Sequence, residues 1–144
     1  MIEKKLLKQH AKNYLPCYFE GCKQHEHCLH WLVGPYVPDT ERARKCVNVM
    51  NKEIRKGNCP FFRPDTKVPM KRGFHHLYDD MTKRMGTAIR ESLERHYGHT
   101  MYYKYRNGLL PITPAMQEHI AQVCRKYGWN DTPLYNYTTE EYMW

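Results

Sequence analysis

The sequence predicts a small α+β domain, in which helices surround a short antiparallel hairpin and an irregular, zinc-finger-like segment precedes them. Residues 81–97 and 114–127 repeat apolar side chains at three- and four-residue spacing, as amphipathic helices do. Between them, an aromatic run at 101–106 leads into Asn-Gly, the dipeptide that most favours a tight hairpin turn. Five of the six cysteines lie within residues 1–64, where no long helical period is visible.

The chain has 144 residues, about the length of one domain, so we expect a single domain over 1–144. Residues 1–64 would form its cysteine-rich, metal-bound part, and residues 65–144 its helix–hairpin–helix part. No internal repeat and no Gly- or Ser-rich linker separates the two parts. The mean hydropathy of −0.85 and the short apolar runs exclude a membrane-spanning helix. Because the first residues also lack the apolar stretch of a signal peptide, we expect a cytoplasmic protein.

Three segments of the N-terminal part have recognisable patterns. Residues 1–12 have the pattern of an amphipathic helix, and residues 25–33 that of a short helix after a loop. Residues 44–51, RKCVNVMN, alternate in polarity and predict a short strand. Two prolines in CPFFRP, residues 59–64, exclude a regular helix at that position.

The two long helices have recognisable ends. Asp79 or Asp80 can cap the start of the first helix, and Gly98 suits the position after its last turn. Thr113 followed by Pro114 is typical of an N-cap with proline at the first helical position. These signals predict where both helices begin.

Two aromatic segments are less clear. In a strand, Tyr103 and Tyr105 would lie on one face and Tyr102 on the other, so we expect them to be mostly core residues rather than a base-stacking surface. At the end of the chain, Thr138 and Glu141 have the spacing of a capping box. This spacing predicts a terminal helical turn.

Three cysteines within twelve residues, Cys17, Cys22 and Cys28, give the strongest chemical signal, and Cys59 supplies a fourth thiol. Cytoplasmic thiols stay reduced, which favours metal binding over disulfides. Structural zinc takes four ligands in a tetrahedron, commonly four thiolates, or three thiolates and one imidazole. We therefore expect Zn²⁺ on these four cysteines, with an iron–sulfur cluster on the same ligands as the alternative. Reduced buried thiols, or a disulfide or redox switch, are the other interpretations.

Other side chains compete for these roles. His25, His27 and His30 lie in the same stretch, and any one of them can replace a cysteine ligand. Cys46 falls in the predicted strand, where it can simply be packed. Cys124 lies on the apolar face of the last helix, where a free cysteine behaves as a small hydrophobic residue, so we assign it to the core.

No catalytic motif is complete. His25-Glu26 begins like the metalloprotease motif HExxH, but Leu29 stands where the second histidine is needed. The P-C-x-x-C of zinc deaminases and the glycine-rich phosphate loops are also missing. A metal- or thiol-dependent enzyme is therefore only the third interpretation of the sequence.

The charge of the chain is +8, and it is unevenly distributed. Residues 52–72 hold seven Lys and Arg residues against two acidic ones. A basic surface attracts polyanions, of which nucleic acid is the most abundant in a cell. The residues expected to contact phosphates are Lys56, Arg63, Lys67, Lys71 and Arg72. The alternative is that these cations only solvate the surface.

Residues from most of the chain together resemble the pattern of a known family. They are Cys17, Cys22 and Cys28-Leu29; CPFFRP at 59–64; Lys67-Val68; Gly73, His76, Leu77, Tyr78 and Asp79; Tyr102-Tyr103; Pro111-Ile112 and Pro114; and the stretch from Tyr137 to Trp144. The set resembles a family of small cysteine-containing proteins of Bacteroides-type gut bacteria, whose domain has no known function. The resemblance implies a bacterial cytoplasmic protein, and it selects the first three cysteines and Cys59 over Cys46 and Cys124. It implies no activity.

The sequence thus predicts a non-enzymatic module with structural zinc that binds nucleic acid, or a nucleic-acid machine such as the ribosome or a polymerase, through a basic face. The alternative is a protein–protein adaptor that uses exposed aromatic side chains and the acidic C-terminal tail. The oligomeric state is not readable from the sequence.

Overall fold

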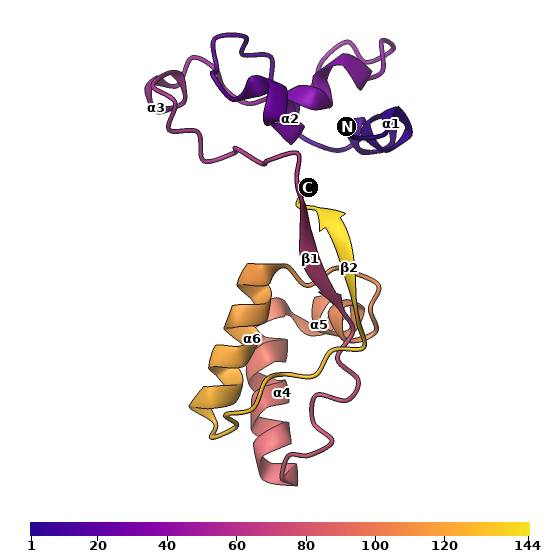
Figure 1. The fold of residues 1–144 in the computed structure, drawn as a ribbon, viewed down its shortest axis with the longest axis vertical. Helices are drawn as coiled ribbons and strands as arrows, with labels where there is room; N and C mark the ends of the chain where they lie inside the picture. The colour runs from indigo at the N-terminus through magenta and orange to yellow at the C-terminus, as the bar shows by residue number, and fades with distance from the viewer. The chain divides into compact units, whose positions relative to one another are not determined.

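The computed structural model describes residues 1–144, and the chain folds into two compact units. Unit 1 comprises Met1–Thr66 together with Tyr142–Trp144, and unit 2 comprises Lys67–Glu141. The sequence-based division falls after residue 64, whereas the units divide after Thr66, and the last three residues return to unit 1. Six α-helices and one two-stranded antiparallel sheet confirm the α+β class (Figure 1).

Unit 1 is built from short helices joined by irregular segments. Its elements are α1 (Lys4–Ala11), two 3₁₀ turns (His25–His27 and Gly34–Tyr36), α2 (Leu29–Leu32) and α3 (Lys52–Arg55). The expected helices at 1–12 and 25–33 are confirmed by α1 and by the turn that leads into α2. The core cluster consists of Ile2, Leu7, Ala11, Leu29 and Val33, and the unit also buries Cys28, Val47 and Ile54. So few buried apolar side chains give the unit little hydrophobic stabilisation for its length.

The C-terminal residues complete the core of unit 1. Trp144 stacks on His10 of α1, with ring centroids 3.8 Å apart and planes 8° from parallel. It also meets Tyr14 edge-on, with centroids 5.4 Å apart. Burial lowers the pKa of His10, which favours the neutral imidazole in this stack. The terminal tryptophan is therefore engaged within the chain.

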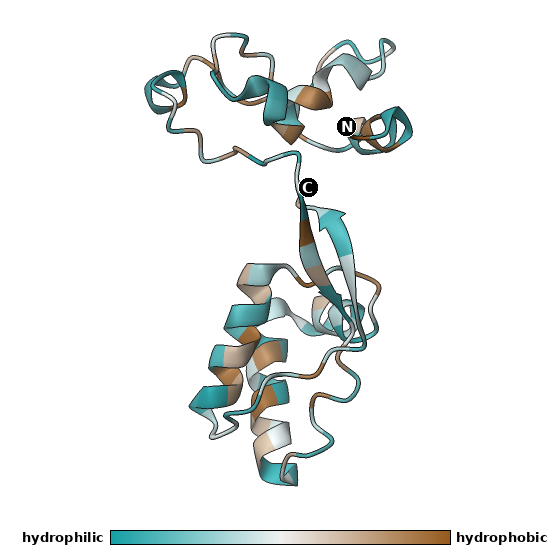
Figure 2. Cartoon of the chain, viewed as in Figure 1, coloured by the Kyte–Doolittle hydropathy of each residue, from teal (hydrophilic) through white to brown (hydrophobic).

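Unit 2 consists of three helices and the two-stranded sheet. Its elements are β1 (Lys67–Arg72), α4 (Lys83–Tyr97), α5 (His99–Arg106), α6 (Pro114–Lys126) and β2 (Tyr137–Tyr142), whose last residue groups with unit 1. Helix α6 contacts both α4 and β1, and α4 and α6 lie side by side (Figure 1). Figure 2 shows apolar stretches alternating with polar ones along both helices. The core consists of Phe74, Leu77, Ile89, Leu93, Tyr102, Ile112, Ile120, Val123 and Cys124.

The two long amphipathic helices are confirmed, and threonine caps both. Thr113 caps α6 as expected. Helix α4 begins later than the aspartates suggest, because the Oγ1 atom of Thr82 accepts a hydrogen bond from the N–H of Met85 at 3.2 Å. Gly98 ends α4 with a φ of 82°, a conformation that other residues rarely adopt. None of the helices combines the length and the apolar character that crossing a bilayer requires.

The predicted strand and hairpin at 101–108 are wrong, because these residues form α5 and its C-terminal cap. The N–H of Leu109 donates to the carbonyl of Lys104 at 2.9 Å, and the N–H of Gly108 to that of Tyr105 at 3.1 Å. Gly108 has a φ of 76°. A glycine with positive φ follows a helix as readily as it forms a hairpin turn, so the Asn-Gly signal has two interpretations.

The remaining local predictions at strands and turns are also wrong. Residues 44–51 form no strand: the N–H of Val47 donates to the carbonyl of Pro16 at 2.9 Å, and the N–H of Asn51 donates within the stretch to the carbonyl of Asn48 at 3.1 Å. The expected helical turn at the C-terminus is part of β2, where Thr138 accepts a hydrogen bond from Lys71 Nζ at 2.9 Å. The sheet joins β1 to β2 across most of unit 2, and local patterns carry no information on such distant pairing.

Candidate metal centre

The four cysteines that the sequence selects, Cys17, Cys22, Cys28 and Cys59, line one cavity in unit 1. Its volume of about 30 Å³ accommodates one water molecule or one ion, and it is far too small for an organic substrate. The wall is otherwise mostly apolar, and its other members include Phe19, Trp31, Val47, Ile54, Phe61 and Phe62, with His25 and His30 beside the thiols.

Backbone pairing brings the distant cysteine to the first three. The N–H of Cys17 donates to the carbonyl of His30 at 2.7 Å, which ties the first cysteine loop to α2. Cys28 forms an isolated antiparallel bridge with Pro64, at the end of the CPFFRP segment that begins with Cys59. Segments about thirty residues apart in sequence are thus fixed around the same cavity.

The other three cysteines affect the pKa of the Cys17 thiol. Burial raises the pKa of Cys17, the backbone N–H of Phe19 lowers it by hydrogen bonding, and the charges of Cys28, Cys59 and Cys22 raise it again. Without a cation, these effects together hold the pKa of Cys17 above its ordinary value and favour its protonated thiol. A bound cation reverses this balance, because it stabilises each thiolate that ligates it.

As the side chains stand, no group of three or more His, Cys, Asp or Glu residues is placed to hold a metal ion. A cysteine side chain has one rotatable bond with three staggered positions. Rotation about that bond moves the sulfur atom and leaves the backbone in place. Coordination by the four cysteines therefore requires their side chains to turn toward the cavity that they line.

The three candidate histidines differ in the nitrogen atoms that they leave available. His30 is 6% exposed; its Nδ1 donates to the carbonyl of Leu15 at 2.6 Å, and its Nε2 lies 3.1 Å from the Tyr14 hydroxyl, so both nitrogens are engaged. His27 is exposed, pairs with Asp65 and does not line the cavity. The Nδ1 atom of His25 donates to the carbonyl of Cys22, which leaves its Nε2 atom as the one alternative to a thiolate.

The structure separates the remaining two cysteines from this cavity. Cys124 is fully buried in the core of unit 2, which confirms its assignment to the core, and burial raises the pKa of its thiol to about 11. Cys46 is exposed rather than packed in a strand. The sequence predicts Phe61 and Phe62 as apolar residues packed against the cysteine loop, and both line the cavity. No local pattern indicates Ile54 as part of the wall, because it stands between Glu53 and Arg55.

The five cations predicted to form one basic face are divided between the two units. Lys56 and Arg63 belong to unit 1, and Lys67, Lys71 and Arg72 belong to unit 2. Lys56 pairs with Glu53 at 3.2 Å on the surface, and Arg63 Nη1 donates to the carbonyl oxygens of Pro60 and Phe62. The exposed Lys67 begins β1. These five residues therefore do not define a single face within either unit.

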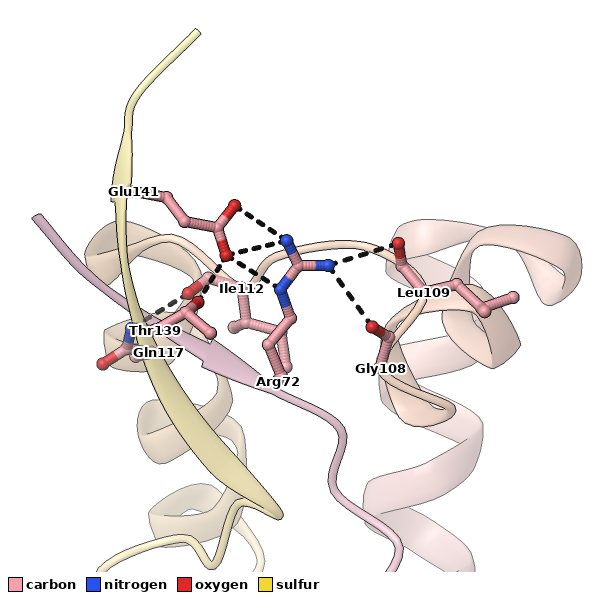
Figure 3. A network of polar contacts seen from close by, with 7 residues as sticks. All are labelled: Arg72, Gly108, Leu109, Ile112, Gln117, Thr139 and Glu141. Carbon is pink, nitrogen blue, oxygen red and sulfur yellow. Dashed lines mark hydrogen bonds and ion pairs between the residues drawn. The ribbon is translucent and has the colours of Figure 1, made fainter. Parts of the chain in front are cut away.

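Arg72 has a structural role in unit 2 (Figure 3). Its Nη2 atom donates to both carboxylate oxygens of Glu141 at 2.7 Å, and its Nη1 atom donates to the carbonyl oxygens of Gly108 and Leu109 at 3.3 Å. Thr139 donates a further hydrogen bond to Glu141. Because one guanidinium joins β1, β2 and the loop after α5, Arg72 is not available to a phosphate.

This ion pair predicts an acid-dependent loss of stability. Burial alone would raise the pKa of Glu141, but the hydrogen bonds from Arg72 and Thr139 and the charge of Arg72 outweigh it and hold the pKa below its ordinary 4.5. The pair therefore stabilises unit 2 above about pH 4.5, and this contribution is lost as the pH falls through the lowered value. Glu141→Gln should lower the free energy of unfolding by about 1–3 kcal/mol at pH 7 and by less at pH 3, as urea titrations at both values will show.

Glu118→Gln is the matched control, because Glu118 pairs with Arg125 at 2.8 Å on an exposed surface of the same unit. It should cause a smaller loss at pH 7, since exposed pairs contribute little. Equal losses for the two variants at pH 7 would contradict the structural role of the Arg72–Glu141 pair.

Comparison with known proteins gives one match. The model of a family of unknown function, DUF6078, matches residues 1–144. The chain belongs to the DUF6078 family. Because the match covers the whole chain, the cavity with its four cysteines lies within the family domain. Searches of curated proteins and of solved structures return no match.

Proposed function

We propose that this DUF6078 protein is a non-enzymatic binding module in which Cys17, Cys22, Cys28 and Cys59 hold a structural Zn²⁺ ion and unit 1 binds nucleic acid. The observation that carries the proposal is that all four cysteine residues line one cavity of about 30 Å³. Disulfide-free thiols in an apolar enclosure of this size fit one thiolate-bound ion. A single Zn²⁺ fits this volume better than an iron–sulfur cluster, which adds further metal and sulfide atoms.

The ion would act as a structural element. Unit 1 has few buried apolar side chains and long irregular segments, and small domains of this kind are commonly stabilised by metals. A catalytic zinc site keeps one position open to substrate, and this cavity has no room for one. These features favour a binding role over a metal- or thiol-dependent enzyme.

Several cations lie next to the cavity lining in sequence. We define the rim as five residues adjacent in sequence to the cavity lining or part of it: Tyr18, Lys23, Lys56, Phe61 and Arg63. Unit 1 as a whole has 12 Lys and Arg residues against 7 Asp and Glu residues, a formal charge of +5. Glu20, Glu26 and Glu53 also lie next to lining residues, and Glu53 pairs with Lys56, so the charge beside the cavity is mixed with a small positive excess. A surface of this kind attracts phosphate groups.

The adaptor alternative has less support. Its main aromatic anchor, Trp144, stacks on His10 inside unit 1, and Tyr142 packs against the same core. A residue that completes the core of its own unit contributes little to an interface. Glu141 of the acidic tail is also paired with Arg72, so its carboxylate is not available to a partner protein.

The proposal predicts salt-dependent binding by unit 1. Fluorescence anisotropy with labelled DNA and RNA oligonucleotides should show an affinity that falls steeply as the salt concentration rises. Lys56→Glu and Arg63→Glu should each weaken binding and reduce the slope of log affinity against log salt by about 0.7–0.9, the value of one phosphate contact. Lys83→Glu, a charge reversal of an exposed residue in unit 2, is the matched control and should change the affinity less.

The zinc content of each variant is measured in parallel, so that a loss of binding is not mistaken for a loss of fold. Binding that is independent of salt, or that is unchanged by both charge reversals in unit 1, would contradict the proposed nucleic-acid function. It would leave the zinc proposal untouched, because the two rest on different residues.

A further inference from the structure

We infer that the partner of unit 1 is single-stranded nucleic acid, and that Tyr18 and Phe61 on the rim stack on its unpaired bases. This inference rests on the proposed nucleic-acid function and specifies its substrate class. Both rings stand beside a cysteine of the candidate centre: Tyr18 follows Cys17, and Phe61 is two residues after Cys59. Tyr18 is 54% exposed and Phe61 is 40% exposed.

Phe61 places an aromatic ring two residues from the guanidinium group of Arg63 in the sequence. The Phe61 ring meets the buried His30 ring edge-on, with centroids 6.2 Å apart, and it lines the cysteine cavity. Arg63 lies close enough for its charge to contribute to lowering the pKa of His30, after the larger effect of burial. Its Nη1 atom is fixed by the carbonyl oxygens of Pro60 and Phe62. The other guanidinium nitrogens remain available to a phosphate next to a base stacked on Phe61.

Tyr18 is supported by the chain on one side. A Cβ atom at Gly34 would lie 3.1 Å from Cε1 of Tyr18 and 3.3 Å from the carbonyl oxygen of Cys17, so the ring packs closely against a position that has no side chain. A ring that is supported in this way and more than half exposed offers a preorganised surface for stacking. Preorganisation lowers the entropy lost on binding.

The helices next to the cavity do not fit a duplex. The major groove admits an α-helix or a two-stranded β-ribbon, and proteins that read it present several side chains from one such element. The helices next to the cavity, α2 and α3, have four residues each, and unit 1 contains no two-stranded ribbon of its own. In a duplex the faces of the bases are covered by stacking, whereas in a single strand they are accessible to aromatic rings.

The test compares a single strand with a duplex. Fluorescence anisotropy is measured with labelled single-stranded DNA and RNA of about 12 nucleotides, and with the duplex of the same sequence. We expect Tyr18→Ala and Phe61→Ala each to lower the single-strand affinity about 5- to 150-fold, with the salt slope unchanged. Tyr18→Phe and Phe61→Tyr, which keep the rings, should retain the affinity. Tyr137→Ala, a tyrosine in unit 2 that is 55% exposed, is the matched control and should bind as the parent does.

Phe61 lines the cavity, so its replacement can also disturb the fold; Tyr18 does not line it, and the Tyr18 variants keep the test decisive. Alanine variants that bind single strands as the parent does, while Arg63→Glu still weakens binding, overturn the inference and leave the proposed function in place. Equal affinity for the duplex, with equal sensitivity to Tyr18→Ala, overturns the inference as well. A parent protein that binds none of the oligonucleotides overturns both proposals.

Discussion

Replacing Cys28 by serine should unfold unit 1 while unit 2 stays folded. Structural zinc contributes on the order of 10–16 kcal/mol of binding free energy that is coupled to folding, which is comparable to the whole stability of a small domain. The buried cluster around α1 and α2 has only five residues, and hydrophobic packing of this extent does not replace the contribution of the ion. Hydrogen exchange is the measurement: the amides of Cys17 and Leu29, bonded to His30 and Arg63, should lose protection.

The controls separate loss of metal from loss of packing. Cys46→Ser changes an exposed cysteine outside the cavity and should leave exchange and zinc content unchanged. Cys28 is buried, so its serine variant also places a hydroxyl in an apolar site; removing the metal from the unmodified protein with a chelator avoids this effect. Both treatments should expose the same amides. Full protection of Cys17 and Leu29 after complete chelation would contradict the structural role of the ion.

The second large effect is expected at the centre of unit 2. Tyr102→Ala should lower the free energy of unfolding of unit 2 by about 3–5 kcal/mol, because it leaves a large cavity in the core. Tyr102 is fully buried, its hydroxyl lies 2.9 Å from that of Tyr78, and its ring meets Phe74 edge-on at 5.5 Å. Urea unfolding, followed by the NMR amide signals of α4 and α6, measures the change.

Two variants calibrate this result. Tyr102→Phe keeps the ring and removes one hydrogen bond, so the loss should be about 1 kcal/mol. Leu109→Ala removes an apolar side chain of the same unit that is 68% exposed, and it should be nearly neutral. If Tyr102→Ala is as mild as Leu109→Ala, then Tyr102 is not buried and α5 does not place residues 99–106 as described.

Long amphipathic segments were predictable from sequence, because the apolar period of α4 and α6 extends over several turns. Thr113-Pro114 and Gly98 mark two of their ends, whereas the start of α4 lies at Thr82 rather than at the predicted Asp79 or Asp80. Short elements were not. The Asn107-Gly108 pair fits both a hairpin turn and a helix C-cap, and Thr138 with Glu141 fits both a capping box and a strand. In both cases tertiary packing determines which secondary structure forms. Tyr102 is buried as part of α5, and the Arg72–Glu141 pair holds β2 beside β1.

The candidate centre was predictable in its ligands and not in its surroundings. Cysteine spacing selected the four residues that the structure places around one cavity. The charge pattern at 52–72 predicts one continuous basic segment. The chain passes from unit 1 to unit 2 within this segment, and Arg72 forms an ion pair with Glu141. The charge pattern of the sequence therefore indicates a positively charged segment, but it does not show which of its cations are available to a binding partner.

Native mass spectrometry of the untagged protein shows whether the four cysteines hold a metal ion. We expect one Zn²⁺ ion per chain, bound with the displacement of thiol protons, and lost in Cys17→Ser, Cys22→Ser, Cys28→Ser and Cys59→Ser but retained in Cys46→Ser and Cys124→Ser. Protein isolated in the presence of zinc that carries no bound ion, or an ion whose binding is indifferent to the first four substitutions, would contradict this expectation.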